Sequence, residues 1–210
     1  MPRIVFITGQ PGVGKTTVLL NVVETLRRRG YKVGGMISRE VRERGVRIGF
    51  EIIDIYTGQR GWLAHVNQPK GPQVSKYRVK LDDLKTIGAN SILNAIKKTN
   101  IVAIDEIGPM ELFSPAFKEA VVKALKSNKP LLGTIHHKAQ DKLINTIKTR
   151  ENTEILEVTY ENRNTLHNLI IDKVIDYLTL IEFECKSHVL TNKMKGKNGK
   201  TRAKSNSLSR

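Results

Sequence analysis

Short apolar runs alternate with helical patterns along most of this chain. The apolar runs lie at 3–8, 32–38, 101–104, 130–135 and 155–158. Apolar residues recur at helical spacing in the segments 18–26, 84–96, 117–125, 143–147 and 166–178. Strands that are apolar on both faces and alternate with helices are typical of a parallel sheet that is covered on both sides. The pattern therefore predicts an α/β fold of three layers, with a mainly parallel sheet and helices on both of its faces.

One region departs from this alternation. Residues 48–56 form a strand pattern directly after an arginine-rich polar stretch, 39–47, that contains Gly45. Two strands joined by such a polar, glycine-containing stretch predict an antiparallel hairpin, inserted after the second strand with its turn at 43–45. A short strand is expected at 62–66, and a loop at 67–75, where proline and glycine recur.

The stretch 9–16, Gly-Gln-Pro-Gly-Val-Gly-Lys-Thr, fits the phosphate-loop pattern G-x-x-x-x-G-K-[ST] at every fixed position. It lies between the first strand and the first helix, as a phosphate-binding loop requires. Glycines let the backbone fold closely around phosphate oxygens, and the start of the helix presents unpaired N–H groups. Lys15 is expected to reach the β- and γ-phosphates, and the Thr16 hydroxyl to bind Mg²⁺. The motif therefore predicts a P-loop fold that binds a nucleoside phosphate.

A second group of residues follows the apolar strand 101–104, which ends in Asp105 and Glu106. Ligands of open α/β sheets bind at the carboxyl edge of the strands, where these two acids are expected. Asp105 is expected to hold Mg²⁺ directly or through water, and Glu106 to align or deprotonate the attacking water. Two surface acids that merely cap a strand are the structural alternative.

Residues 105–108, Asp-Glu-Ile-Gly, also match the D-x-x-G switch of GTPases, in which Gly108 would contact the γ-phosphate. A GTPase should also carry an N-K-x-D guanine reader after a later strand. The nearest candidate, Asn-Lys-Pro-Leu at 128–131, lacks the Asp and precedes the strand. We therefore expect weak discrimination among bases.

The stretch 105–112, Asp-Glu-Ile-Gly-Pro-Met-Glu-Leu, together with Gly35 and the hairpin 42–58, resembles the small P-loop nucleoside-triphosphatases of thermophiles. The human cancer-related nucleoside-triphosphatase belongs to the same family. The resemblance covers about residues 1–178 and implies Mg²⁺-dependent hydrolysis of several nucleoside triphosphates to diphosphate and phosphate. By this match the nucleotide site comprises Gly9, Gln10, Pro11, Gly12, Val13, Gly14, Lys15, Thr16, Ile101, Val102, Ala103, Ile104, Asp105, Glu106, Ile107 and Gly108. The neighbouring Thr17 is also predicted to bind the nucleotide. The motifs themselves predict Lys15 and Glu106 as catalytic residues and Thr16 and Asp105 as metal ligands.

Half of the formal net charge of +16 lies near the C-terminus, because 186–210 holds eight Lys or Arg residues and no Asp or Glu. This segment has few apolar residues, so we expect a domain at 1–180 and a disordered basic tail at 181–210. The tail either binds nucleic acid weakly or extends into solvent without a partner. No apolar run is long enough to span a membrane. The chain opens directly into a strand, which predicts a cytoplasmic protein without a signal peptide.

Several roles stay open at this level. His136 is either a γ-phosphate sensor or a structural residue at the end of a strand. The hairpin either supplies a transition-state arginine or simply faces solvent, and two later arginines are further candidates. The candidates are Arg39, Arg42, Arg44, Arg47, Arg150 and Arg163. A nucleoside or nucleotide kinase and a nucleotide-dependent RNA- or DNA-binding switch are the alternative functions. The sequence leaves the oligomeric state undetermined.

Overall fold

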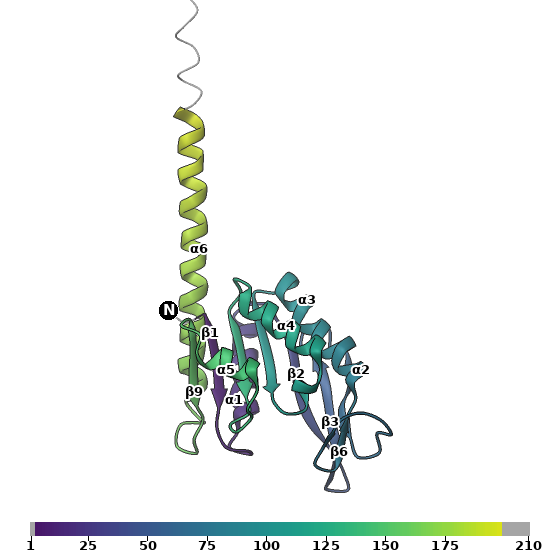
Figure 1. The fold of residues 1–210 in the computed structure, drawn as a ribbon. Coiled ribbons are helices and arrows are strands. Elements are labelled where there is room, and N and C mark those ends of the chain that lie inside the picture. The colour runs from purple at the N-terminus through teal and green to yellow at the C-terminus, as the bar shows by residue number, and fades with distance from the viewer. Residues whose placement is uncertain (1–2, 199–210) are drawn as a thin grey trace, which may run out of the picture.

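In the computed structural model the described residues, 3–198, build one nine-stranded sheet with helices on both faces (Figure 1). The order of the strands is β5-β6-β4-β3-β2-β7-β8-β1-β9. The strands are β1 Ile4–Thr8, β2 Val33–Glu43, β3 Val46–Asp54, β4 Arg60–His65, β5 Gln73–Val74, β6 Tyr77–Val79, β7 Ile101–Ile107, β8 Leu131–Ile135 and β9 Thr153–Glu157. Strands β2, β7, β8, β1 and β9 are parallel, whereas β3 to β6 add an antiparallel extension. The predicted fold class is confirmed.

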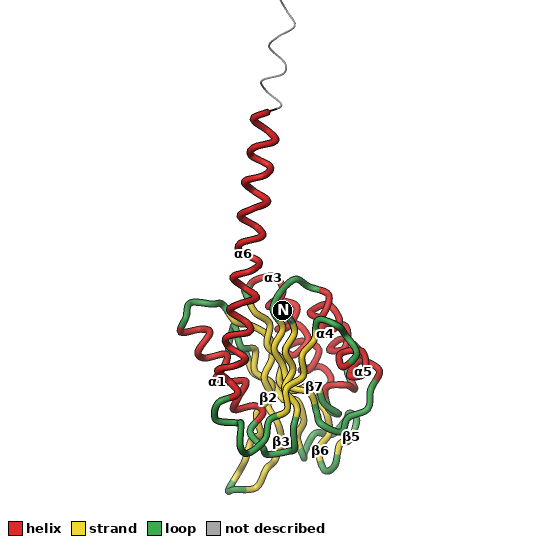
Figure 2. The backbone as a smooth tube through the Cα atoms, turned by 90° about the vertical axis from the view of Figure 1, so that its left-hand side faces the viewer, coloured by secondary structure: helices red, strands yellow, loops and turns green. Residues whose placement is uncertain are grey.

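Helices cover both faces of the sheet, which gives the molecule its three layers (Figure 2). The helices are α1 Lys15–Arg28, α2 Leu81–Asp83, α3 Asn90–Lys98, α4 Pro115–Lys126, α5 Lys142–Lys148 and α6 Leu166–Asn198, with a π-helix, η1 Leu84–Ala89, and a 3₁₀ turn, η2 Glu111–Phe113. One core cluster joins the sheet to α3, α4 and α5, and the other joins it to α1 and α6. The strands between them are apolar on both sides because both sides are buried.

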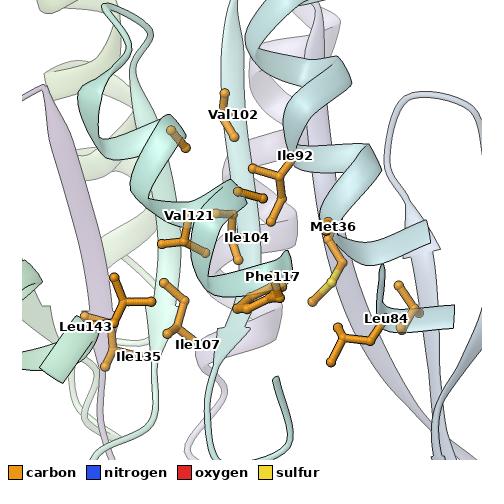
Figure 3. Packing of buried hydrophobic residues seen from close by; sticks show 14 of the residues in the cluster. Met36, Leu84, Ile92, Val102, Ile104, Ile107, Phe117, Val121, Ile135 and Leu143 are labelled. Carbon is orange, nitrogen blue, oxygen red and sulfur yellow. The ribbon is translucent and has the colours of Figure 1, made fainter. Parts of the chain in front are cut away.

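The core under α3 and α4 combines side chains from these helices with side chains from β2, β7 and β8 (Figure 3). Phe117 and Val121 of α4 pack with Ile104 of β7, and all three are fully buried. Helix α4 begins as the sequence predicts: Pro115 is its first residue, and the Ser114 hydroxyl accepts a hydrogen bond from the Phe117 N–H at 3.2 Å. This packing fixes the strand that leads into Asp105 and Glu106.

The hairpin formed by β2 and β3 is longer than its apolar pattern indicates. Ile37 of β2 lies beside Asp105 of β7, and beyond this residue β2 continues to Glu43 paired with β3. The turn lies where it was expected, with positive φ at Arg44 and Gly45, as a tight two-residue hairpin turn requires. Strand β2 therefore extends beyond the point at which its parallel pairing with β7 ends.

Two local features differ from what the sequence indicates. Residues 81–98 are helical, in agreement with the helical spacing at 84–96, but a π-helical turn, η1, separates α2 from α3. A side chain at Gly88 would approach the Met36 sulfur to 2.9 Å, so glycine permits close packing of this turn on the sheet. The loop expected at 67–75 contains β5, which pairs with β6.

Helix α6 continues to Asn198. Residues 181–198, which were expected to be disordered, are therefore helical in this structure. Between 178 and 195 the sequence has no Gly or Pro and contains several good helix formers, which explains the extension. Residues 199–210 lie outside the described residues. Helix α6 projects beyond the body of the molecule (Figure 1). Among the described residues no helix is long and apolar enough to cross a membrane, and the cytoplasmic location stays a prediction.

Candidate active site

The loop between β1 and α1 has the backbone that its glycines allow. Gly9, Gly12 and Gly14 all have positive φ, at 145°, 78° and 112°. A side chain at Gly9 would lie 2.7 Å from the carbonyl oxygen of Val158, so this position requires glycine. Helix α1 starts at Lys15 with no side-chain cap among the described residues. Its first N–H groups are therefore free to bind an anion.

Lys15 lies between the loop and the end of β7. Its Nζ donates a hydrogen bond to the Gly9 carbonyl at 3.2 Å and lies 3.9 Å from Oε1 of Glu106. The lysine side chain is largely buried, so its charge acts in a partly desolvated environment. The structure thus brings the two predicted catalytic residues together.

Asp105 is held by two hydroxyl groups. Thr16 Oγ1 donates to Asp105 Oδ2 at 2.8 Å, and Thr134 Oγ1 donates to Oδ1 at 2.5 Å. The carboxyl group is only 2% exposed; burial raises its pKa, and the two hydrogen bonds oppose this shift. Thr134 belongs to β8 and was not among the predicted site residues. Its contact with Asp105 depends on the pairing of β7 with β8, which the sequence does not reveal.

Thr16 and Asp105 form an oxygen donor set that fits Mg²⁺. This ion prefers oxygen ligands, dehydrates reluctantly and is bound through few protein groups together with substrate phosphates. No group of three or more His, Cys, Asp or Glu side chains that could hold a metal occurs among the described residues. A divalent ion here would accordingly share its coordination shell with a phosphate ligand.

Glu106 is placed beside this pair, with its side chain 26% exposed. Its Oε1 atom is buried and accepts no hydrogen bond from the described residues. Burial raises the pKa of Glu106 to about 7, and the nearby Lys15 charge opposes the rise. The carboxyl group therefore loses its proton less readily than an exposed glutamate, and it has an oxygen available to accept a hydrogen bond.

Gly108 donates its backbone N–H to Oε2 of Glu111 at 3.2 Å. Glu111 is 4% exposed, and burial raises its pKa to about 8. Sequence reasoning missed this role of Glu111, which lies in the acidic motif but gave no separate signal. The Gly108 N–H, which the D-x-x-G interpretation assigns to the γ-phosphate, is thus already engaged within the protein.

A cleft of about 460 Å³ opens beside the P-loop. Its walls come from the loop, the start of α1, the end of β7, His136 and the β2–β3 hairpin. The lining residues are Pro11, Gly12, Gly14, Lys15, Thr16, Thr17, Ser38, Arg39, Glu40, Arg47, Phe50, Glu106 and His136. Burial lowers the pKa of His136, and the Lys15 charge lowers it further, so the imidazole is neutral at pH 7.

Not every predicted site residue reaches this cleft. The side chains of Ile101, Val102, Ala103, Ile104 and Ile107 are fully buried in the core and position the acids that interrupt or follow them. Gly9 and Val13 shape the loop from its inner side, where Val13 is only 3% exposed.

A second hollow, of about 240 Å³, adjoins the other side of the loop and shares Gly14 and Thr17 with the cleft. It is also lined by Asn21, Arg163 and Asn164. The guanidinium of Arg163 lies 5.2 Å from the centre of the Tyr160 ring. Arg150, the other late arginine predicted from the sequence, instead donates to Asn152 and lines neither hollow.

Known proteins are similar to this chain in sequence and in fold. A nucleoside-triphosphatase THEP1 of Thermofilum pendens is 47% identical over 161 residues, which cover 76% of this chain and 88% of the relative. One from Methanocaldococcus jannaschii is 42% identical, covering 81% and 96%. Among solved structures, the human cancer-related nucleoside triphosphatase has a TM-score of 0.71 and 36% identity, covering 82% of this chain and 97% of the human one. THEP1 from Aquifex aeolicus has a TM-score of 0.72 at 28% identity, covering 81% and 98%.

These relatives confirm the resemblance that the acidic motif indicated. The family model described as NTPase matches residues 4–171, which include the P-loop, the β2–β3 hairpin and the strand-end acids. The chain therefore belongs to this family of nucleoside-triphosphatases.

Proposed function

We propose that the protein hydrolyses nucleoside triphosphates to nucleoside diphosphate and phosphate in the presence of Mg²⁺, with weak selectivity among bases. One observation carries the proposal: Lys15, the Thr16–Asp105 pair and an oxygen of Glu106 that accepts no hydrogen bond from the described residues meet beside an open P-loop. Each supports a different requirement of phosphate transfer, namely phosphate binding, metal binding and activation of water.

Binding of the triphosphate rests on the loop amides and on Lys15. The amides at the start of α1 carry the partial positive charge of a helix N-terminus. Lys15 exchanges its contact with the Gly9 carbonyl for the β- and γ-phosphate oxygens. Thr16 and Asp105 would hold Mg²⁺, which neutralises charge on the phosphates when it is bound.

Glu106 is proposed as the group that aligns and deprotonates the attacking water. Its free Oε1 is suited to accept a proton from a water placed in line with the γ-phosphate. A general base works best with a pKa near the operating pH, which agrees with the pKa of about 7 for Glu106. The GTPase-like alternative, in which Gly108 reads the γ-phosphate, is disfavoured because Glu111 occupies the Gly108 N–H.

Weak base selectivity is supported by the second hollow. Its polar side chains are Asn21, Arg163 and Asn164, next to the loop residues Gly14 and Thr17. A guanidinium plane can stack on any base without reading its hydrogen-bonding edge. A nucleoside seated there would consequently be held with little discrimination.

The test is release of phosphate from ATP, GTP, CTP and UTP without any acceptor, with Mg²⁺ and with a chelator. We expect release from all four, and loss of the activity when Mg²⁺ is removed. A nucleoside or nucleotide kinase would release almost no phosphate without its acceptor. A nucleotide-dependent RNA- or DNA-binding switch would bind nucleic acid even when hydrolysis is abolished. Weak binding of nucleic acid through the basic tail is also proposed, and it rests on the charge of the tail alone.

A further inference from the structure

The β2–β3 hairpin brings two arginines, Arg39 and Arg47, to the phosphate cleft. Ile37 lies beside Asp105 in the parallel pairing of β2 with β7. Arg39 follows two residues later on β2 and so shares a strand face with Ile37. Strand β2 therefore carries Arg39 just past the strand-end acids, into the wall that faces the P-loop residues of the same cleft.

Arg47 has two of its three guanidinium nitrogens engaged within the protein. Its Nε donates to the Tyr77 hydroxyl at 2.9 Å, and its Nη1 pairs with Oε2 of Glu40 at 3.0 Å. The guanidinium also lies 5.1 Å from the centre of the Phe50 ring and 5.6 Å from that of Tyr77. These contacts suit a residue that stiffens the wall of the cleft.

Arg39 is held differently. Its Nε lies 2.9 Å from Oε1 of Glu51, its direct neighbour across the strand pair. No hydrogen bond or ion pair to its Nη groups occurs among the described residues, and the side chain is 63% exposed. The Glu51 carboxylate lies close to the inner end of the guanidinium without accepting a hydrogen bond from it, while the two outer nitrogens are free to bind a ligand.

The other hairpin arginines do not reach the cleft. Arg42 pairs with Glu40 and donates to the Gly45 carbonyl, and Arg44 occupies the turn itself. Neither lines the cleft. Of the four hairpin arginines, Arg39 is the one at the cleft whose two outer nitrogens both lack a partner among the described residues.

We propose that Arg39 is a further catalytic residue, whose outer guanidinium nitrogens bind the γ-phosphoryl group as it is transferred. This inference rests on the hydrolysis proposed above. In the transition state charge spreads over the equatorial oxygens of the γ-phosphoryl group, and Lys15 is the one cation that the loop contributes. A guanidinium fork matches two such oxygens at once.

Arg39 takes part without forming a covalent bond. The water oxygen attacks the γ-phosphorus, the bond from phosphorus to the bridging oxygen breaks, and the water proton passes to Glu106. Arg39 supplies charge and hydrogen bonds that are strongest when the phosphoryl group is in transit. Its removal should therefore affect the rate far more than the affinity for nucleotide.

The chain offers a matched control in Arg60. Oε2 of Glu51 lies 3.4 Å from Nη1 of Arg60, so Arg39 and Arg60 both pair with the same carboxylate. Arg60 does not line the cleft. Replacement of either arginine by alanine removes one partner of Glu51, but only the loss of Arg39 removes a charge from the cleft.

The experiment compares Arg39→Ala, Arg39→Lys and Arg60→Ala with the wild type in single-turnover ATP hydrolysis and in equilibrium binding of ATP and of ADP with aluminium fluoride. We expect Arg39→Ala to slow turnover by about 10³-fold, the lower end of the effect of such arginines. Its affinity for ADP with aluminium fluoride should fall far more than its affinity for ATP, and added guanidinium should restore part of the rate. Arg60→Ala should keep a near wild-type rate, and Arg39→Lys should fall between the two alanine variants.

A wild-type rate in Arg39→Ala, or an equal loss in Arg60→Ala, would overturn the inference and leave the proposed hydrolysis standing. A loss of ATP affinity that accounts for the whole effect of Arg39→Ala would also overturn it, because Arg39 would then bind only the ground state. Failure of the wild type to hydrolyse any triphosphate would instead contradict the proposed function. Thermal unfolding of each variant checks that it is folded. If Arg39→Ala does not fold, the comparison of Arg39→Lys with the wild type and Arg60→Ala replaces it.

Discussion

The hydroxyl of Thr16 donates a hydrogen bond of 2.8 Å to the carboxylate of Asp105, which joins the first turn of α1 to the end of β7. The two residues are 89 positions apart in the chain and meet because α1 packs over the neighbouring strands β8 and β7. Thr134 of β8 holds the other carboxylate oxygen. The fold thereby presents a hydroxyl and a carboxylate side by side, as a Mg²⁺ ion bound to phosphates requires.

Replacement of Asp105 by Asn should raise the Mg²⁺ concentration needed for half-maximal hydrolysis by more than about tenfold, since even outer-shell partners of a metal are worth 10–100-fold. Asparagine keeps the size of the side chain but removes its charge. A titration of the rate against Mg²⁺ measures this effect. An unchanged titration curve in the folded variant would remove Asp105 from the proposed metal site.

Replacement of Glu111 by Gln should change how stability depends on pH. Burial raises the pKa of Glu111 to about 8 from an ordinary value of 4.5. Between those values the folded protein keeps the proton that the unfolded chain has released, so the free energy of unfolding falls as pH rises. Glutamine titrates nowhere in this range, and its side-chain oxygen can still accept the Gly108 N–H.

Urea unfolding of wild type and Glu111→Gln between about pH 5 and pH 8 measures this difference. The stability of the variant relative to wild type should increase with pH, by on the order of a few kcal/mol across the range. Glu106 also has a raised pKa, but it is present in both proteins and largely cancels in the comparison. Parallel stability curves would show that Glu111 is not protonated in the folded protein.

Removal of residues 186–210 should leave hydrolysis unchanged. Strands β9 and β1 are parallel, so α6 starts at the edge of the sheet that holds the P-loop and runs back past the opposite edge. Its projecting end therefore lies far from the cleft (Figure 1). Any affinity for RNA should fall, and depend less on salt, because eight Lys or Arg residues are lost. A large drop in turnover by the folded, truncated protein would contradict this placement.

The sequence predicted the parts of the site that depend on local patterns. The P-loop glycines, Lys15, Thr16 and the strand-end acids are recognisable because each motif adjoins the strand or helix that positions it. Thr134 and Glu111 gave no such signal, since their contacts with Asp105 and Gly108 depend on strand pairing and on the turn η2. A hydroxyl near the end of a neighbouring buried strand was the available clue to Thr134.

The departures in the fold have similar causes. The π-helical turn η1 contains Gly88, which packs closely on Met36, and helical periodicity does not reveal either feature. The hairpin turn was predictable because Gly45 and its polar neighbours give a local signal. The selection of Arg39 among four hairpin arginines required the register of β2, β3 and β7, which the sequence alone does not provide.

The central claim is that Glu106 activates the attacking water. Replacement of Glu106 by Gln keeps the size of the side chain and leaves Lys15, Thr16 and Asp105 in place. Nucleotide should still bind, and turnover should fall by about 10²–10⁴-fold, the usual contribution of a positioned general base. This loss corresponds to roughly 3–5 kcal/mol of transition-state stabilisation.

Single-turnover hydrolysis of ATP by Glu106→Gln, together with equilibrium binding of ATP, tests this claim most directly. Our account predicts near wild-type affinity with a rate reduced by about two to four orders of magnitude. Hydrolysis of ATP by Glu106→Gln at close to the wild-type rate would contradict it.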